Sequence, residues 1–173
     1  MRNSRGFTLI ELLIVVAIIG IIAAIAIPSL LRARVSANEA ATVGDIRAVV
    51  SAEAAYHSAA FGFYGMLTCL NVPSGCISGY SKAAPTFIDT TIAGTVTKSG
   101  YTRSFASNAP GVHPNLLAGG IGGYLYAATP LTQDQTGVRG FAGDSSGRIC
   151  FTNDGSVPPL NGNLLAATCS AVQ

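Results

Sequence analysis

After six residues the chain enters an apolar stretch from Phe7 to Leu31. Within it, the sixteen residues from Leu12 to Ile27 carry no polar side chain. Twenty-five helical residues rise about 37 Å, which exceeds the roughly 30 Å hydrocarbon core of a bilayer. The pattern therefore predicts a membrane-spanning helix over residues 7–31.

The helical pattern continues through residues 32–60 in amphipathic form. Apolar residues recur there at three- and four-residue spacing, charged residues fall largely on other faces, and frequent alanine gives high helix propensity. We expect one helix from about Phe7 to Ala60, roughly 80 Å long. Gly62 and Gly65 follow it and predict its end.

Two residues disturb the apolar half of this helix. Gly20 costs about 1 kcal/mol relative to alanine. Pro28 removes a backbone hydrogen bond and is expected to kink or break the helix. In a membrane, neighbouring helices can tolerate such a kink, so a simple transmembrane kink is one interpretation of the pair.

Beyond the helix, residues 61–173 have the texture of strands and turns. Seventeen of the twenty glycines and seven of the eight prolines fall here. The candidate strands are Thr86–Ile92, Thr95–Thr97, Tyr101–Ala106, Gly123–Thr129, Val138–Ala142 and Arg148–Thr152. Asp144–Gly147 predicts a hairpin turn and Asn153–Gly155 another turn. The expected fold class is α+β, with an antiparallel sheet of about four strands laid on the C-terminal half of the helix.

One charge interrupts the apolar stretch near its start, at Glu11. A carboxylate at membrane depth costs roughly 2.5–3.5 kcal/mol and therefore indicates a function and a partner. A plain membrane anchor and an ordinary secretory signal are the simpler interpretations, since Ala24-Ile25-Ala26 forms an A-x-A cleavage site. The length of the stretch and Glu11 both argue against the secretory signal. Flanking arginines do not settle orientation, because two precede the apolar stretch and two follow it.

Charge is sparse in this chain. Charged residues make up 10% of it, mean hydropathy is +0.46, and the formal net charge is +2. Without residues 1–6, which include two arginines, 8 basic residues face 8 acidic ones. A neutral chain without a basic face does not indicate a nucleic-acid partner. Nine charges in residues 61–173 suit a surface that packs against copies of itself.

The four cysteines all follow the apolar stretch: Cys69, Cys76, Cys150 and Cys169. An even number in an exported region favours disulfides, and four cysteines allow three pairings. A zinc site is the alternative. The spacings C-x6-C and C-x18-C lack the short knuckle that structural zinc sites use, so we expect no metal.

No catalytic constellation is evident, and neither an enzyme nor a cofactor is predicted. His57 and His113 have no acid or nucleophile at a recognisable spacing. The glycine-rich run at 119–123 lacks the Lys-Ser/Thr of a phosphate loop and predicts a surface turn. Asp134, Asp144 and Asp154 fall in predicted turns, and their spacing does not match that of an EF-hand calcium site.

The nine residues from Arg5 to Leu13, Arg-Gly-Phe-Thr-Leu-Ile-Glu-Leu-Leu, resemble the class III signal of type IV pilins and type II secretion pseudopilins. The resemblance implies a leader of residues 1–6, cut by a prepilin peptidase between Gly6 and Phe7, and N-methylation of Phe7. It makes Glu11 the fifth mature residue, which pairs with the Phe7 amine during assembly. It also implies helix melting between Gly20 and Pro28 on assembly, and the sequential disulfides Cys69–Cys76 and Cys150–Cys169.

The same resemblance implies location and partners. The precursor spans the cytoplasmic membrane once with its leader in the cytoplasm, and the assembled chain lies on the cell surface. The domains are then 1–6 (leader), 7–31 (transmembrane and filament core), 32–60 (amphipathic helix) and 61–173 (β-rich domain). Expected partners are other copies in a helical filament, the prepilin peptidase, and an inner-membrane assembly platform with its cytoplasmic extension ATPase. An outer-membrane secretin joins them if the envelope is Gram-negative.

Three functions compete. A type IV pilus subunit is favoured by the sparse charge and by the cysteines near the C-terminus. A type II secretion pseudopilin shares the same N-terminal signature. A membrane-anchored binding or enzymatic domain is the distant alternative, and a mere tether has no reason to carry Glu11.

Overall fold

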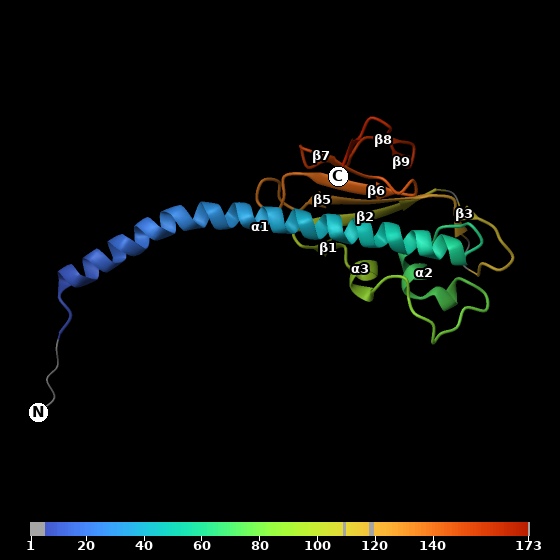
Figure 1. Cartoon of the computed structure of the whole chain (residues 1–173), viewed down its shortest axis with the longest axis horizontal. Coiled ribbons are helices and arrows are strands. Elements are labelled where there is room, and N and C mark those ends of the chain that lie inside the picture. Colours follow the sequence, from blue (N-terminus) through green and yellow to red (C-terminus); the bar gives the residue numbers. More distant parts are fainter. Residues whose placement is uncertain (1–5, 109, 118–119, 173) are drawn as a thin grey trace, which may run out of the picture. The chain divides into compact units, whose positions relative to one another are not determined.

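The computed structural model describes residues 6–108, 110–117 and 120–172 (Figure 1). The chain divides into two compact units, one ending at Arg34 and the other beginning at Val35. The helices are α1 (Leu9–Ala59), α2 (Leu67–Asn71), the 3-10 helix η1 (Pro73–Gly75) and α3 (Thr90–Gly94). The strands are β1 (Thr97–Lys98), β2 (Tyr101–Ser107), β3 (Pro110–Gly111), β4 (Gly120–Ile121), β5 (Tyr124–Pro130), β6 (Gly140–Asp144), β7 (Ile149–Thr152), β8 (Leu160–Asn161), β9 (Leu164–Leu165) and β10 (Ser170–Ala171).

Helix α1 begins and ends within two residues of the expected bounds. The helix continues through Pro28, so this proline does not break it. In the second unit, one face of α1 is buried against the sheet through residues such as Ile46, Val49 and Tyr56. Their spacing of three and seven residues places them on one side of the helix, as the apolar pattern predicts.

The C-terminal end of α1 is closed by two residues with left-handed backbone. Phe61 has φ of 55° and Gly62 has φ of 83°. The Gly62 N–H donates to the His57 carbonyl at 3.1 Å, the long bond of a Schellman cap. Gly62 therefore ends the helix as predicted, while Phe61 takes the left-handed position that glycine usually occupies.

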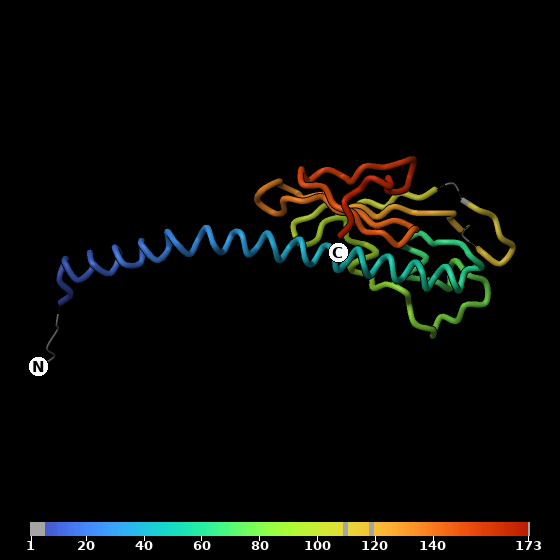
Figure 2. The backbone as a smooth tube through the Cα atoms, turned by 45° about the horizontal axis from the view of Figure 1, so that its top comes forward, coloured from blue at the N-terminus to red at the C-terminus, as the bar shows by residue number. Residues whose placement is uncertain are grey.

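The main sheet is antiparallel, with strand order β1-β2-β5-β6-β7-β10. Four longer strands, β2, β5, β6 and β7, form its centre, and two-residue strands extend each edge. The β6–β7 turn is closed by the Gly147 N–H, which donates to the Asp144 carbonyl at 3.0 Å. These features confirm the expected α+β class, a long helix with an antiparallel sheet (Figure 2).

Alternating residues of the sheet build two cores. Tyr124, Tyr126 and Phe141 face α1 and join the larger hydrophobic cluster. Leu125 and Ala142 face the other way, into a smaller cluster that Leu165 and the C-terminal segment cover. The part of the C-terminal segment that carries β8 and β9, drawn in red, lies over the sheet on the side away from α1 (Figure 1), while Val172 packs on the larger cluster. Both faces of the sheet are therefore covered by the chain itself.

Gly143 lets α1 lie close to β6. A Cβ at this position would meet Ile46 Cγ2 at 2.7 Å, which is too short for a real side chain, and Val50 Cγ2 at 3.0 Å, which is a tight contact. Glycine here is explained by close packing of helix and strand.

Three predicted strands need correction. Thr86–Ile92 is not a strand, because the Asp89 side chain accepts the Ile92 N–H at 2.8 Å and starts helix α3 instead. The strand expected at Thr95–Thr97 is displaced to β1. The strand expected from Val138 begins only at Gly140.

Glu39 on α1 explains the late start of β6. Its Oε1 accepts the backbone N–H groups of Val138 and Arg139, both at 3.0 Å, so these groups do not join a strand ladder. Its Oε2 accepts Nε and Nη2 of Arg139 at 2.9 and 2.7 Å. The desolvation of Glu39 raises the pKa of its carboxyl, but the bonds from Arg139 and Val138 outweigh it and leave that pKa below the ordinary value. One carboxylate thus fixes the β5–β6 connection to the helix.

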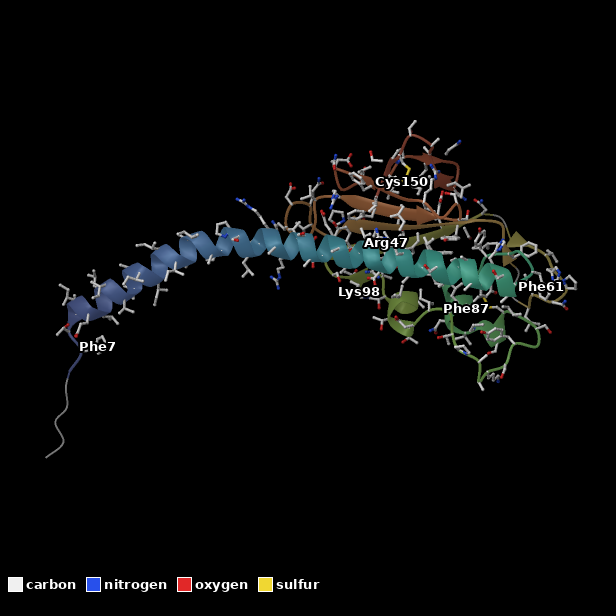
Figure 3. All side chains as sticks on the ribbon, in the orientation of Figure 1. Phe7, Arg47, Phe61, Phe87, Lys98 and Cys150 are labelled. Atoms are coloured by element: carbon white, nitrogen blue, oxygen red, sulfur yellow. A yellow bond between two sulfur atoms is a disulfide. The ribbon has the colours of Figure 1, made fainter. Side chains whose placement is uncertain are left out.

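The cysteines form two disulfides, Cys69–Cys76 and Cys150–Cys169, with Cα–Cα distances of 5.6 and 5.8 Å. This is the sequential pairing that the resemblance implies. The first disulfide joins α2 to the segment after η1, and the second joins β7 to the residue before β10 (Cys150 in Figure 3).

Removing Cys150–Cys169, which closes the longer loop, is expected to cost more stability than removing Cys69–Cys76. Cys150 and Cys169 are 19 residues apart, and Cys69 and Cys76 are 7 apart. The loop-closure entropy of the unfolded chain then gives stabilisations of about 3 and about 2 kcal/mol, respectively. Urea denaturation of the full chain in detergent should show this order for the double variants Cys150→Ala/Cys169→Ala and Cys69→Ala/Cys76→Ala. Unchanged midpoints, or peptide mapping that joins Cys76 to Cys150, would contradict it.

Candidate processing and assembly site

The segment before α1 is held by a reciprocal pair of hydrogen bonds between Thr8 and Glu11. The Thr8 N–H and Oγ1 donate to Glu11 Oε2 at 2.9 and 2.5 Å. In return the Glu11 N–H donates to Thr8 Oγ1 at 3.3 Å. This is a capping box, with Thr8 as the N-cap of a helix that starts at Leu9. The single carboxylate of the apolar stretch thus has a local partner in the uncleaved chain.

The predicted cleavage bond lies outside the helix. Gly6 and Phe7 precede the capping box, and both are exposed, Phe7 to 79% (Figure 3). A Cβ built on Gly6 meets nothing within 4 Å. The rest of the predicted leader, residues 1–5, falls outside the described residues. The backbone around Gly6 and Phe7 is therefore open to a protease.

The apolar side chains of the first unit have no cover within it. Every large hydrophobic residue from Leu9 to Leu31 is between 45% and 81% exposed. They project on opposite sides of α1 (Figure 3). Among the described residues, α1 is the one helix long and apolar enough to cross a membrane, with a mean hydropathy of 3.1 in its most apolar window. Burial of this surface requires lipid or other protein chains.

Gly20 lies in this exposed part of α1, where an added Cβ would meet nothing within 4 Å. No close packing therefore explains the glycine. Its role with Pro28 in helix melting stays a prediction.

The other candidate groups have local structural roles. The His57 ring lies against the Tyr64 ring at 4.6 Å, and the His113 ring stacks on Phe61 at 4.5 Å. Asp144 is buried and accepts the Leu165 N–H at 2.9 Å, while Asp154 accepts the Ser156 N–H at 3.1 Å.

The glycine-rich run at 119–123 extends beyond the described residues at its first position, and Gly120 and Ile121 form β4. Within the described part of the chain, His, Cys, Asp and Glu gather in no group that could hold a metal ion.

Comparison with known proteins points to the same N-terminal segment. Residues 1–27 match the family described as the prokaryotic N-terminal methylation motif. The chain is 69% identical over 39 residues to the type IV wide pilus major component PilA4 of Thermus thermophilus. It is 46% identical over 56 residues to the type IV major pilin protein PilA of Myxococcus xanthus. It is also 41% identical over 51 residues to the type II secretion system core protein G of Pseudomonas aeruginosa.

These matches cover part of each chain: 22%, 32% and 30% of this one, and 30%, 26% and 36% of the respective relatives. No solved structure matches the chain. A methylation-motif segment, a long apolar helix and an α+β domain are together consistent with the type IV pilin fold. Over its N-terminal segment the chain is therefore similar to type IV pilins and to a type II secretion core protein.

Proposed function

We propose that the chain is a structural subunit of a type IV pilus and polymerises through the N-terminal part of α1. One observation carries the proposal: a helical surface of large apolar side chains, uncovered from Leu9 to Leu31, bears a single carboxylate at Glu11. Lipid covers such a surface before assembly, and the same surface of other copies covers it afterwards. A tether needs the apolar surface but not the carboxylate.

Processing precedes assembly in this proposal. The precursor spans the cytoplasmic membrane once, with its leader in the cytoplasm. The prepilin peptidase cuts between Gly6 and Phe7 and methylates the Phe7 amine. An inner-membrane platform driven by a cytoplasmic extension ATPase then adds the subunit to the filament, which leaves a Gram-negative cell through a secretin.

Glu11 changes partner during these steps. Before cleavage Phe7 has no free amine, and the Thr8 capping box partly satisfies the carboxylate. Cleavage creates an amine whose unperturbed pKa near 8 keeps it largely cationic at neutral pH. That amine can reach Glu11 of its own chain or of the last subunit in the filament. The intermolecular pair removes part of the cost of both charges in lipid and sets the axial register.

A pseudopilin of a type II secretion system is the second candidate, favoured by the match to core protein G. A pilus subunit is supported by the sparse charge and the two disulfides of the β-rich domain. Mechanical shearing of cells distinguishes the two functions. As a pilus subunit, the chain should be abundant in the sheared filament fraction. Its retention in the cell envelope of cells that shed other filaments would indicate the pseudopilin instead.

A further inference from the structure

A buried arginine lies at the edge of the main sheet, beside β1. The side chain of Arg103 on β2 is 2% exposed, and its Nη2 donates to Asp45 on α1. Lys98 on β1 donates to the other oxygen of Asp45 at 2.9 Å. One carboxylate therefore serves two cations (Lys98 in Figure 3).

Three donors of this region lack acceptors. Nε and Nη1 of Arg103 and the hydroxyl of Tyr126 are buried, and none has a hydrogen-bond partner among the described residues. Tyr126 pairs with Phe105 across β2 and β5, so it is the diagonal neighbour of Arg103 on the face toward α1. Burial raises the pKa of the Tyr126 hydroxyl, while the charge of Arg103 and the approach of its guanidinium to the hydroxyl oxygen oppose that rise. Unpartnered buried donors are costly, and a ligand that accepts hydrogen bonds removes that cost.

Arg103 and Tyr126 line a hollow of about 200 Å³ beside α3. Ile92 and Phe105 give it apolar walls, and the exposed residue Val96 lies at its margin. The hollow thus combines a cation and a hydroxyl with apolar surface, in a space that suits a small molecule or a single side chain.

The two carboxylates nearest the hollow already have partners. Asp45 is shared between Lys98 and Arg103. The other carboxylate near Lys98 belongs to Asp89, which is exposed and bonded to the Ile92 N–H at the start of α3. Neither leaves an acceptor for Nε and Nη1 of Arg103. We propose that this hollow binds a small carboxylate, held by Arg103 and by the Tyr126 hydroxyl.

A carboxylate can come from two sources. One is a free organic acid of a few carbons. The other, which rests on the proposed function, is an Asp or Glu side chain of a neighbouring subunit in the filament. A bound water would satisfy the same donors without charge and is the outcome that overturns the proposal.

Acetate tests the site in the full-length mature chain in detergent. At constant ionic strength, the Arg103 Nε–H resonance should shift saturably with sodium acetate and not with sodium chloride. Tyr126→Phe keeps the ring and removes the hydroxyl, so it should weaken acetate binding about tenfold or more. Tyr80→Phe is the matched control, because the Tyr80 hydroxyl donates to Pro85 in an exposed position.

Equal shifts with acetate and chloride, or a Tyr126→Phe variant that binds acetate like the parent chain, would overturn the proposal. The density at Arg103 in purified filaments distinguishes the sources. Density continuous with a neighbour's carboxylate identifies the adjoining subunit, isolated density larger than water identifies a free acid, and a water-sized peak contradicts both. The detergent titration needs no filaments, so failure of the pilus assignment leaves its result intact.

Discussion

Glu11→Ala should abolish or sharply reduce filaments while leaving membrane insertion and cleavage intact. Insertion should not suffer, because the change removes a carboxylate that costs roughly 2.5–3.5 kcal/mol at membrane depth. Cleavage should not suffer, because Gly6 and Phe7 lie outside the helix and remain exposed. Assembly should fail, because the Phe7 amine of an incoming subunit loses its partner.

The capping box allows a sharper version of this experiment. Alanine removes both the charge of Glu11 and the two bonds that its carboxylate accepts from Thr8, whereas glutamine can still accept them without a charge. If pairing with the amine matters, Glu11→Gln should fail to assemble like Glu11→Ala. Thr8→Ala, which removes the Thr8 hydroxyl and keeps the charge, should still form filaments.

Immunoblots for processed chain and electron microscopy of sheared filaments measure both steps. Normal filaments from normally processed Glu11→Gln would refute the charge pairing. Normal filaments from Glu11→Gln but not from Glu11→Ala would assign Glu11 to helix capping instead.

Glu53→Gln is expected to stabilise the β-rich domain at pH 8, by about 1–3 kcal/mol. Glu53 lies on α1 and is fully buried. Its Oε2 accepts the Gly65 N–H at 3.0 Å, and its Oε1 has no partner within the described part of the chain. Burial raises the pKa of this carboxyl from an ordinary 4.5 to about 8, against the opposing bond from Gly65. Burial raises the pKa values of Tyr56 and Tyr124, and the nearby Glu53 charge adds to that rise.

The raised pKa fixes the direction of the pH dependence. Between about pH 4.5 and about 8 the folded chain keeps a proton that the unfolded chain releases, so stability falls as pH rises. The contribution of Glu53 is fully present below pH 4.5 and is lost by about pH 8. Glutamine is neutral throughout, so the variant should lose this slope, and its advantage should disappear near pH 4.5.

Urea denaturation from pH 4.5 to 8.5 measures both effects. Glu39→Gln is the matched control, because the pKa of Glu39 is lowered and its contribution is lost as the pH falls. It should weaken the domain at neutral pH, where Glu53→Gln strengthens it. A Glu53→Gln variant with the same pH slope as the parent chain would show that Glu53 does not hold a proton in the fold.

Local patterns predicted much of the fold. The apolar stretch and the alanine-rich segment after it predicted α1, and the Asp144–Gly147 turn predicted the β6–β7 hairpin. Errors arose where a single side chain redirected the backbone. β-Branched and aromatic residues favoured a strand at Thr86–Ile92, but the Asp89 side chain caps helix α3 there. Val138 looked like the start of a strand, but its N–H donates to Glu39, 99 residues away.

Functional residues also divide into those with a local sequence pattern and those defined by the folded structure. The motif from Gly6 to Glu11 is local and can be recognised from sequence alone. The T-x-x-E spacing of Thr8 and Glu11 is a further local signal, from which the capping box could also have been predicted. The roles of Glu53 and Arg103 could not be predicted, because they depend on burial and, for Arg103, on a carboxylate 58 residues away. A buried carboxyl and a solvated one look alike in a sequence.

Intact-mass spectrometry of sheared, purified filaments tests whether the chain is a processed pilus subunit. This chain should be their principal protein, with the mass of residues 7–173, two disulfides and one N-terminal methyl group. A chain that begins at Ile27, after the Ala24-Ile25-Ala26 site, would identify an ordinary secretory signal and contradict the account. So would filaments that lack the chain altogether.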